Sequence, residues 1–201
     1  MQTSSSRFAA SRTQSLQAVK LISNRSQYSS CHIRVPGDDH RLSAIALDGK
    51  FYSFFRSLTD GAKVAGLILK LTARGNEIAL TPTRFGYALW VQEPEAAPAI
   101  PESHHSPRTI SPTFGPADCW VISDRQPGFR TCSLKVTDLP DIVPGIASDR
   151  KLYSLYRRDQ EVDTVFKLAS RLTQRGDEVV LLVSKIGYAL CVEEPGATLI
   201  P

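Results

Sequence analysis

The chain reads KFYSFFR at residues 50–56 and KLYSLYR at residues 151–157, so the same pattern returns after 101 residues. The same offset relates LTARGNE at residues 71–77 to LTQRGDE at residues 172–178. Matches of this length at one fixed spacing indicate an internal duplication, which has to be recognised before the elements are assigned.

The match continues in both directions from these segments. GYALWVQEP at residues 86–94 returns as GYALCVEEP at residues 187–195, and upstream Cys31 aligns with Cys132. The duplication divides the chain into a first unit (residues 16–96, unit 1) and a second unit (residues 117–201, unit 2). A linker with five prolines (residues 97–116) separates them, and a tail rich in serine, predicted to be disordered, precedes them at residues 1–15.

The pattern within one unit predicts strands and one helix. In unit 1 an apolar stripe at Val64, Leu67, Ile68 and Leu71 has the spacing of an amphipathic helix. An arginine followed by glycine, at residues 74–75 and 175–176, is expected to end the helix of each unit. Segments rich in aromatic and β-branched residues predict the strands, with glycine in the last hairpin; they lie at residues 17–23, 30–35, 50–55, 77–81 and 87–92. The expected fold class is α+β: two tandem repeats of a ββ-βαββ unit, each a mostly antiparallel sheet covered by one helix.

Composition places the protein among ordinary globular chains. Hydrophobic residues make up 42% and charged residues 22% of the 201 residues, and no apolar run is long enough for a membrane helix. The net charge is +4, which is weaker than a dedicated nucleic-acid binder usually carries. Unit 1 contributes +3 and unit 2 contributes −1, so any basic patch is expected in unit 1.

Cysteine usage indicates a reducing compartment. The four cysteines form no CxxC pair, which argues against a zinc site of the usual spacing, and they lie in apolar segments typical of buried thiols. We therefore expect a cytoplasmic protein. The alternative is an organelle, if the Ser/Arg-rich start of the chain is a transit peptide.

Histidine argues against a pair of catalytic sites. All four histidines lie in unit 1 or the linker, so no Ser/His/Asp or Cys/His set is shared by both units. No glycine-rich phosphate loop is present either. The sequence therefore predicts a protein that is not an enzyme and that uses no cofactor or metal.

Polar residues kept in both units are candidates for a shared role. Arginine at the end of an aromatic strand is suited to bidentate capture of an anion, although a structural pair with Glu93 in unit 1 and Glu194 in unit 2 is the preferred interpretation. The tentative binding residues are Tyr52, Arg56, Tyr87, Tyr153, Arg157 and Tyr188.

A partial resemblance points to the RNA-recognition motif family. Residues 185–192 (KIGYALCV) are similar to its longer signature, and residues 152–156 (LYSLY) lie where its shorter one would be. In that family the aromatics of two adjacent strands stack on bases. Here Leu190 occupies a stacking position, and the family's second helix and last strand do not follow Pro195, so the similarity is interpreted as core packing.

Three functions remain open. The first is a non-enzymatic binding or scaffolding protein that contacts a protein partner, or a copy of itself, through sheet surfaces. The alternative is single-stranded nucleic-acid binding through the aromatic strands and basic residues of unit 1 such as Arg25 and Arg34. The third is an enzyme or small-anion binder built on Arg56, Arg157 and the two glutamates. A membrane is not an expected partner.

Overall fold

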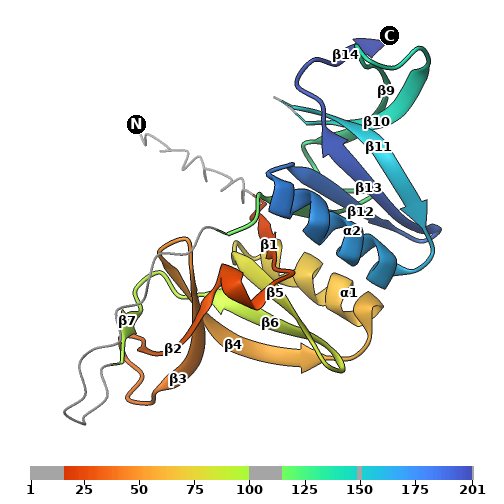
Figure 1. Cartoon of the computed structure of the whole chain (residues 1–201). Coiled ribbons are helices and arrows are strands. Elements are labelled where there is room, and N and C mark those ends of the chain that lie inside the picture. The colour runs from red at the N-terminus through yellow and green to blue at the C-terminus, as the bar shows by residue number, and fades with distance from the viewer. Residues whose placement is uncertain (1–15, 100–114, 149–150, 201) are drawn as a thin grey trace, which may run out of the picture.

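The structure is a computed structural model that describes residues 16–99, 115–148 and 151–200. These residues form one 14-stranded, mostly antiparallel sheet and two α-helices (Figure 1). The strand order is β14-β9-β10-β11-β13-β12-β8-β1-β5-β6-β4-β3-β2-β7, so each unit occupies one half of the sheet. The predicted tail at residues 1–15 and most of the linker lie outside the described residues.

The two halves repeat the same order of elements. Unit 1 contains β1 (Val19–Leu21), a short 3-10 helix (Arg25–Gln27), β2 (Ser29–Arg34), β3 (Leu42–Leu47), β4 (Lys50–Leu58), α1 (Gly61–Thr72), β5 (Ile78–Thr83) and β6 (Gly86–Gln92). The first two residues of the predicted linker form β7 (Ala97–Pro98), which pairs with β2 and extends the half-sheet of unit 1. Unit 2 contains β8 (Cys119–Ser123), β9 (Phe129–Lys135), β10 (Ile142–Ser148), β11 (Leu152–Asp159), α2 (Val162–Arg175), β12 (Val179–Ser184), β13 (Gly187–Glu193) and β14 (Thr198–Ile200). The predicted α+β class with duplicated units is confirmed.

Each unit has one long strand more than the sequence led us to expect. β3 and β10 fall in segments that the sequence pattern assigned to loops. The apolar run of β3 does not alternate, because its last four residues are all buried. A turn signal was nevertheless present after β3, since Asp48 and Gly49 both have positive φ (50° and 71°), as a two-residue hairpin turn of type I′ requires.

The helices begin and end where the sequence chemistry directs. At the start of α1 the Asp60 carboxylate accepts hydrogen bonds from the backbone N–H groups of Ala62 and Lys63. At the end of α2 Gly176 adopts the left-handed conformation (φ 98°) that few other residues tolerate. The Arg-Gly pair predicted to end this helix therefore does so.

The two units dock through both the sheet and the helices. β1 and β8 pair antiparallel at Val19 and Cys119, which joins the half-sheets. Both helices lie side by side between the two halves of the sheet (Figure 1), and one hydrophobic cluster contains residues from both, including Ile68 of α1 and Phe166 of α2. Burial of this shared cluster is the main stabilising contribution to the fold.

A partly exposed ion pair reinforces the junction between the units. The Lys20 ammonium lies 2.9 Å from the Asp118 carboxylate and 3.5 Å from that of Asp48, and it donates to the Pro116 carbonyl. Burial alone would lower the pKa of Lys20, but the hydrogen bond and charge of Asp118, joined by Asp48, raise it above the ordinary lysine value. Lys20 therefore stays charged in the folded protein at neutral pH.

Candidate functional site

Two of the tentative binding residues, Tyr52 and Tyr153, are buried and hydrogen-bonded in the same way. Tyr52 is 0% and Tyr153 is 2% exposed. The hydroxyl of Tyr52 donates to Glu77 at 2.5 Å, and that of Tyr153 donates to Glu178 at 2.6 Å. Burial, and then the adjacent carboxylate, raise the pKa of both tyrosines far above the ordinary value. Both rings are neutral structural groups, and no base can stack on them.

The shared serine and glutamate residues also pair within each unit. Ser53 donates to Glu93 at 2.6 Å, and Ser154 donates to Glu194 at 2.7 Å. Among the described residues no ion pair joins Arg56 to Glu93 or Arg157 to Glu194. The expected Arg–Glu pairs are therefore replaced by Ser–Glu hydrogen bonds. Both arginines lie on the surface, where Arg157 forms an ion pair with Asp159 at 3.0 Å.

Arg56 and Arg157 lie on strand segments that are paired on one side only. β3 pairs with β4 only as far as Ser53, whereas β4 continues to Leu58 along β6. In the same way β10 pairs with β11 only as far as Ser154, and β11 continues to Asp159 along β13. Within the described structure, residues 54–58 and 155–159 thus form two equivalent free sheet edges, which we call the open edges.

Each open edge carries a β-bulge with an exposed aromatic side chain. The register shifts between Phe54 and Arg56 in β4 and between Leu155 and Arg157 in β11. The residue at the bulge is Phe55 in unit 1, 47% exposed, and Tyr156 in unit 2, 56% exposed. A bulge disrupts the ladder and re-aims the side chains around it, and such irregularities are frequent at functional edges.

The two remaining tyrosine candidates differ from each other. Tyr87 lies against α2 of the other unit, where its hydroxyl donates to Asp163 at 2.6 Å and its ring packs edge-on against Phe166. Burial, and then the hydrogen bond to Asp163, raise the pKa of Tyr87. Tyr188 packs against the shared cluster, and the described structure gives its hydroxyl no equivalent acid.

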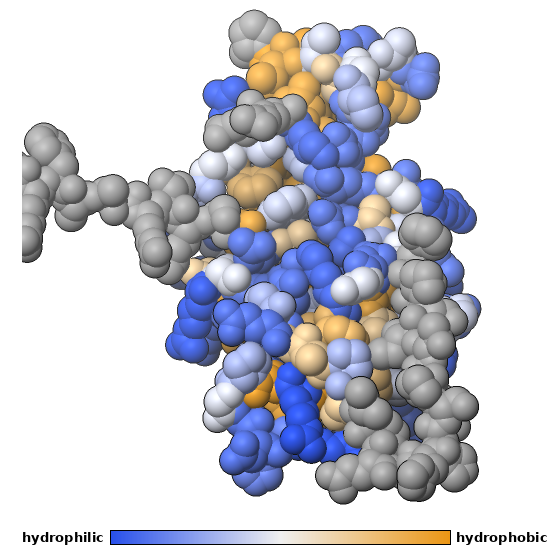
Figure 2. All heavy atoms as spheres, turned by 90° about the vertical axis from the view of Figure 1, so that its left-hand side faces the viewer, coloured by the Kyte–Doolittle hydropathy of each residue, from blue (hydrophilic) through white to orange (hydrophobic). Residues whose placement is uncertain are grey.

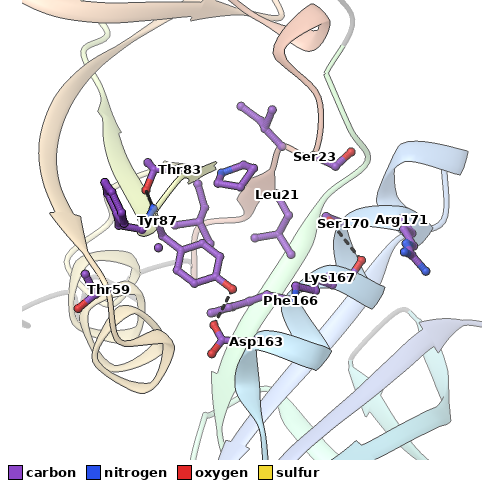
Figure 3. A pocket seen from close by; sticks show the side chains of 15 residues that line it. Leu21, Ser23, Thr59, Thr83, Tyr87, Asp163, Phe166, Lys167, Ser170 and Arg171 are labelled. Atoms are coloured by element: carbon purple, nitrogen blue, oxygen red, sulfur yellow. Dashed lines mark hydrogen bonds between the residues drawn. The ribbon is translucent and has the colours of Figure 1, made fainter.

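A cavity of about 500 Å³ lies beside Tyr87, between unit 1 and α2 (Figure 3). Its apolar lining includes Leu21, Ile22, Leu80, Pro82 and Phe166, and its polar lining includes Ser23, Asp163, Lys167, Ser170 and Arg171. Sequence reasoning selected Tyr87 but none of the α2 residues, because these are not shared with α1 and only the docking of the units brings them to Tyr87.

Unit 2 also exposes an apolar group at the far end of the sheet. Three apolar side chains there are each more than 40% exposed: Leu139 in the loop before β10, Ile142 in β10 and Leu199 in β14. Figure 2 shows apolar side chains gathered at the upper end of the molecule, where Figure 1 places β14, β9 and β10. Unit 1 has Asp38, Arg41 and Pro98 at the equivalent positions.

The described residues offer neither a metal site nor a membrane-spanning helix. No group of three or more His, Cys, Asp or Glu side chains is placed to hold a metal ion there. No helix in that part of the chain is both long and apolar enough to cross a membrane. Comparisons with known protein families, with characterised proteins and with solved structures gave no match.

Proposed function

We propose that this protein is a non-enzymatic binding protein that contacts an extended segment of a protein partner through its open edges. The observation that supports the proposal is the repetition of one unusual feature. Both units leave the second half of the same strand unpaired on one side, and both expose an aromatic side chain there, Phe55 or Tyr156.

An open edge presents backbone N–H and C=O groups that another strand can complete. Strand addition of this kind takes its affinity from main-chain hydrogen bonds and its specificity from the side chains beside them. The exposed rings of Phe55 and Tyr156 supply apolar contact. Arg56 supplies positive charge beside Phe55, whereas Arg157 beside Tyr156 is ion-paired with Asp159 of the same edge at 3.0 Å, so the charge preference rests on unit 1. The expected partner segment is therefore extended, with apolar residues interrupted by Asp or Glu.

The bulges and arginines also oppose pairing between copies of the protein. Charged side chains and bulges are the usual protection of a free edge, because two such edges fit each other poorly. A dimer that paired the open edges of unit 1 would bring two Arg56 side chains of like charge together. The same features that favour an acidic partner therefore disfavour self-association.

The test uses the full chain with both edges altered, Phe55→Ser together with Tyr156→Ser. Proteins retained from a lysate by the immobilised wild type are identified, and the binding of the purified candidate is then measured by titration calorimetry. We expect the double variant to bind at least about tenfold more weakly, since each lost aromatic anchor is worth about 1–2 kcal/mol.

The matched control is Phe85→Ser with Ile186→Ser. These two residues are also equivalent and are more exposed than the edge pair, at 72% and 83%, but they lie in the β5–β6 and β12–β13 hairpin turns. A partner lost equally from both double variants would contradict the edge proposal. Tight, salt-sensitive binding of a single-stranded oligonucleotide by the wild type would instead favour the nucleic-acid alternative.

A further inference from the structure

The cavity beside Tyr87 lies between two hydrogen bonds that connect unit 1 to α2 of unit 2. At one end the Tyr87 hydroxyl donates to Asp163 on the first turn of α2. At the other end the Ser23 hydroxyl donates to Gln174 at 2.9 Å, on the last turn of the same helix. These two hydrogen bonds connect unit 1 to both ends of α2, and Ser23 and Asp163 both line the space of about 500 Å³. Figure 3 shows the Tyr87–Asp163 hydrogen bond at one side of it.

The floor and the rim of the cavity have different chemistry. Leu21, Leu80 and Phe166 provide apolar surface, and all three are buried members of the shared cluster. Lys167 and Arg171 lie on the exposed side of the lining, one helical turn apart (Figure 3). Neither cation forms an ion pair with an acid among the described residues. Two unpaired positive charges beside an apolar floor favour a ligand with an anionic group.

The duplication supplies a control for this site within the same molecule. By the 101-residue offset, Asp163, Phe166, Lys167 and Ser170 of α2 correspond to Ala62, Ala65, Gly66 and Leu69 of α1. Leu69 packs against the shared cluster in the ordinary way of a core side chain. α1 thus has a small or apolar residue where α2 has Asp163, Lys167 or Ser170, so these three polar residues are not a requirement of the scaffold. Arg171, in contrast, corresponds to Lys70, and a cation is kept at that position in both helices.

The volume of the cavity also indicates a ligand site. Protein interiors are packed nearly as densely as organic crystals, and a gap between docked elements loses dispersion contacts. A volume of about 500 Å³ lies within the range of small-molecule sites, which are mostly apolar with a few polar groups that orient the ligand.

We propose that this cavity binds a small organic anion with an apolar body, its anionic group at Lys167 and Arg171 and its body over Leu21, Leu80 and Phe166. The proposal is independent of the strand-edge function, because no residue of either open edge lines the cavity.

The test measures binding of two fluorescent probes of similar shape to the full chain. Anilinonaphthalene sulfonate is an anion with an apolar body, and N-phenylnaphthylamine is its uncharged counterpart. We expect saturable binding of the sulfonate at one site per chain. Lys167→Gln with Arg171→Gln should weaken it by about tenfold or more, as expected for lost charge-assisted contacts, and should change the affinity for the neutral probe by less than about twofold.

Two further variants define where the probe binds. Lys70→Gln with Arg74→Gln removes two exposed cations, also four residues apart, from the last turn of α1 and the turn that follows it, outside the cavity, and should leave both affinities unchanged. Ser170→Trp fills the cavity and should abolish binding of both probes. Thermal unfolding followed by circular dichroism checks that each variant is folded, and the pair of Lys/Arg variants decides the question even if Ser170→Trp does not fold.

The proposal is overturned if the wild type shows no saturable sulfonate binding, or if the α1 and α2 variants lose affinity equally. It is also overturned if a folded Ser170→Trp variant binds both probes as the wild type does. A loss confined to the sulfonate and to the α2 variant is the result that supports it.

Discussion

Unit 1 and unit 2 agree in their buried hydrogen bonds and differ on their surfaces. Tyr52 with Glu77 repeats as Tyr153 with Glu178, at almost the same distance. Their exposed side chains, by contrast, differ at equivalent positions, because Leu139, Ile142 and Leu199 of unit 2 correspond to Asp38, Arg41 and Pro98 of unit 1. Polar residues that both copies keep are therefore mainly parts of the scaffold, and residues kept in one copy mark surfaces that have diverged.

The two units also differ in how they pack the sheet face that carries Tyr52 in unit 1 and Tyr153 in unit 2. In unit 1 Trp90 meets Phe54 edge-on, with ring centroids 5.4 Å apart, and its indole N–H donates to Thr81. In unit 2 Leu155 and Cys191 occupy these positions and line a small cavity of about 80 Å³. The same scaffold thus tolerates close aromatic packing on this face in unit 1 and a small cavity at the equivalent place in unit 2.

The largest expected effect tests whether the units unfold as one body. Leu89 and Leu190 are equivalent, fully buried and members of the shared cluster. Replacing either by alanine should cost about 2–5 kcal/mol, from lost burial and the cavity left behind. Because the cluster is shared, Leu89→Ala should also destabilise unit 2.

Tryptophan fluorescence separates the two units in this experiment. In a Trp90→Phe background the remaining tryptophan, Trp120, belongs to unit 2. Guanidinium unfolding followed at Trp120 should shift to lower denaturant when Leu89→Ala is added. An unchanged Trp120 midpoint, with circular dichroism showing that unit 1 has weakened, would mean that the units unfold independently.

The next largest effect compares two partly buried carboxylates, Glu77 and Glu178. Glu178 accepts hydrogen bonds from Lys151, Tyr153 and Trp120, whereas Glu77 has Tyr52 and Lys50 as partners. Glu178→Gln should therefore cost more than Glu77→Gln, within a range of about 1–3 kcal/mol for disturbing a buried polar network. Equal free energies of unfolding for the two variants would show that the Trp120 contact adds nothing.

Glu178 also gives a pH signature. Burial alone would raise the pKa of Glu178, but hydrogen bonds from Lys151, Tyr153 and Trp120 lower it below the ordinary value. A carboxyl with a lowered folded-state pKa stabilises the protein above its unfolded pKa of about 4.3, and this contribution is lost as pH falls through the folded value. Between pH 5 and 3 the wild type should therefore lose more stability than Glu178→Gln, measured by urea unfolding.

A smaller effect is expected at the junction of the units. Lys20→Met keeps much of the side-chain packing but removes the charge paired with Asp118, and should cost about 1–2 kcal/mol. The pKa of Lys20 is raised in the folded state, so its contribution is complete below the unfolded pKa of about 10.4 and is lost as pH rises through the folded value. Between pH 9 and 12 wild-type stability should fall toward that of the variant; parallel profiles would exclude Lys20 as the cause.

The sequence predicted the repeat, the α+β class and the helix ends, because these depend on local signals such as the stripe from Val64 to Leu71. It did not predict β3, whose buried run lacks alternation. It also did not predict the open edges or the cavity. Contacts between residues distant in the chain determine the point at which β3 stops pairing with β4 and the face of α2 that contacts Tyr87. No local sequence pattern encodes such contacts.

The smallest expected effect is the loss of one hydroxyl oxygen at two equivalent positions, Tyr87 and Tyr188, and it gives the most direct comparison of the units. Tyr87→Phe removes the hydroxyl that connects unit 1 to Asp163 and should cost about 1 kcal/mol, the usual net value of one hydrogen bond. At Tyr188 the position equivalent to Asp163 is Ala62, so Tyr188→Phe should cost less than about 0.5 kcal/mol. In an Asp163→Ala background, Tyr87→Phe should fall to the Tyr188→Phe value, since the partner is then already absent. Equal costs for the two tyrosines in the wild type would mean that the hydrogen bond between the units does not distinguish them, and the asymmetry of the duplication would then be confined to the exposed surface.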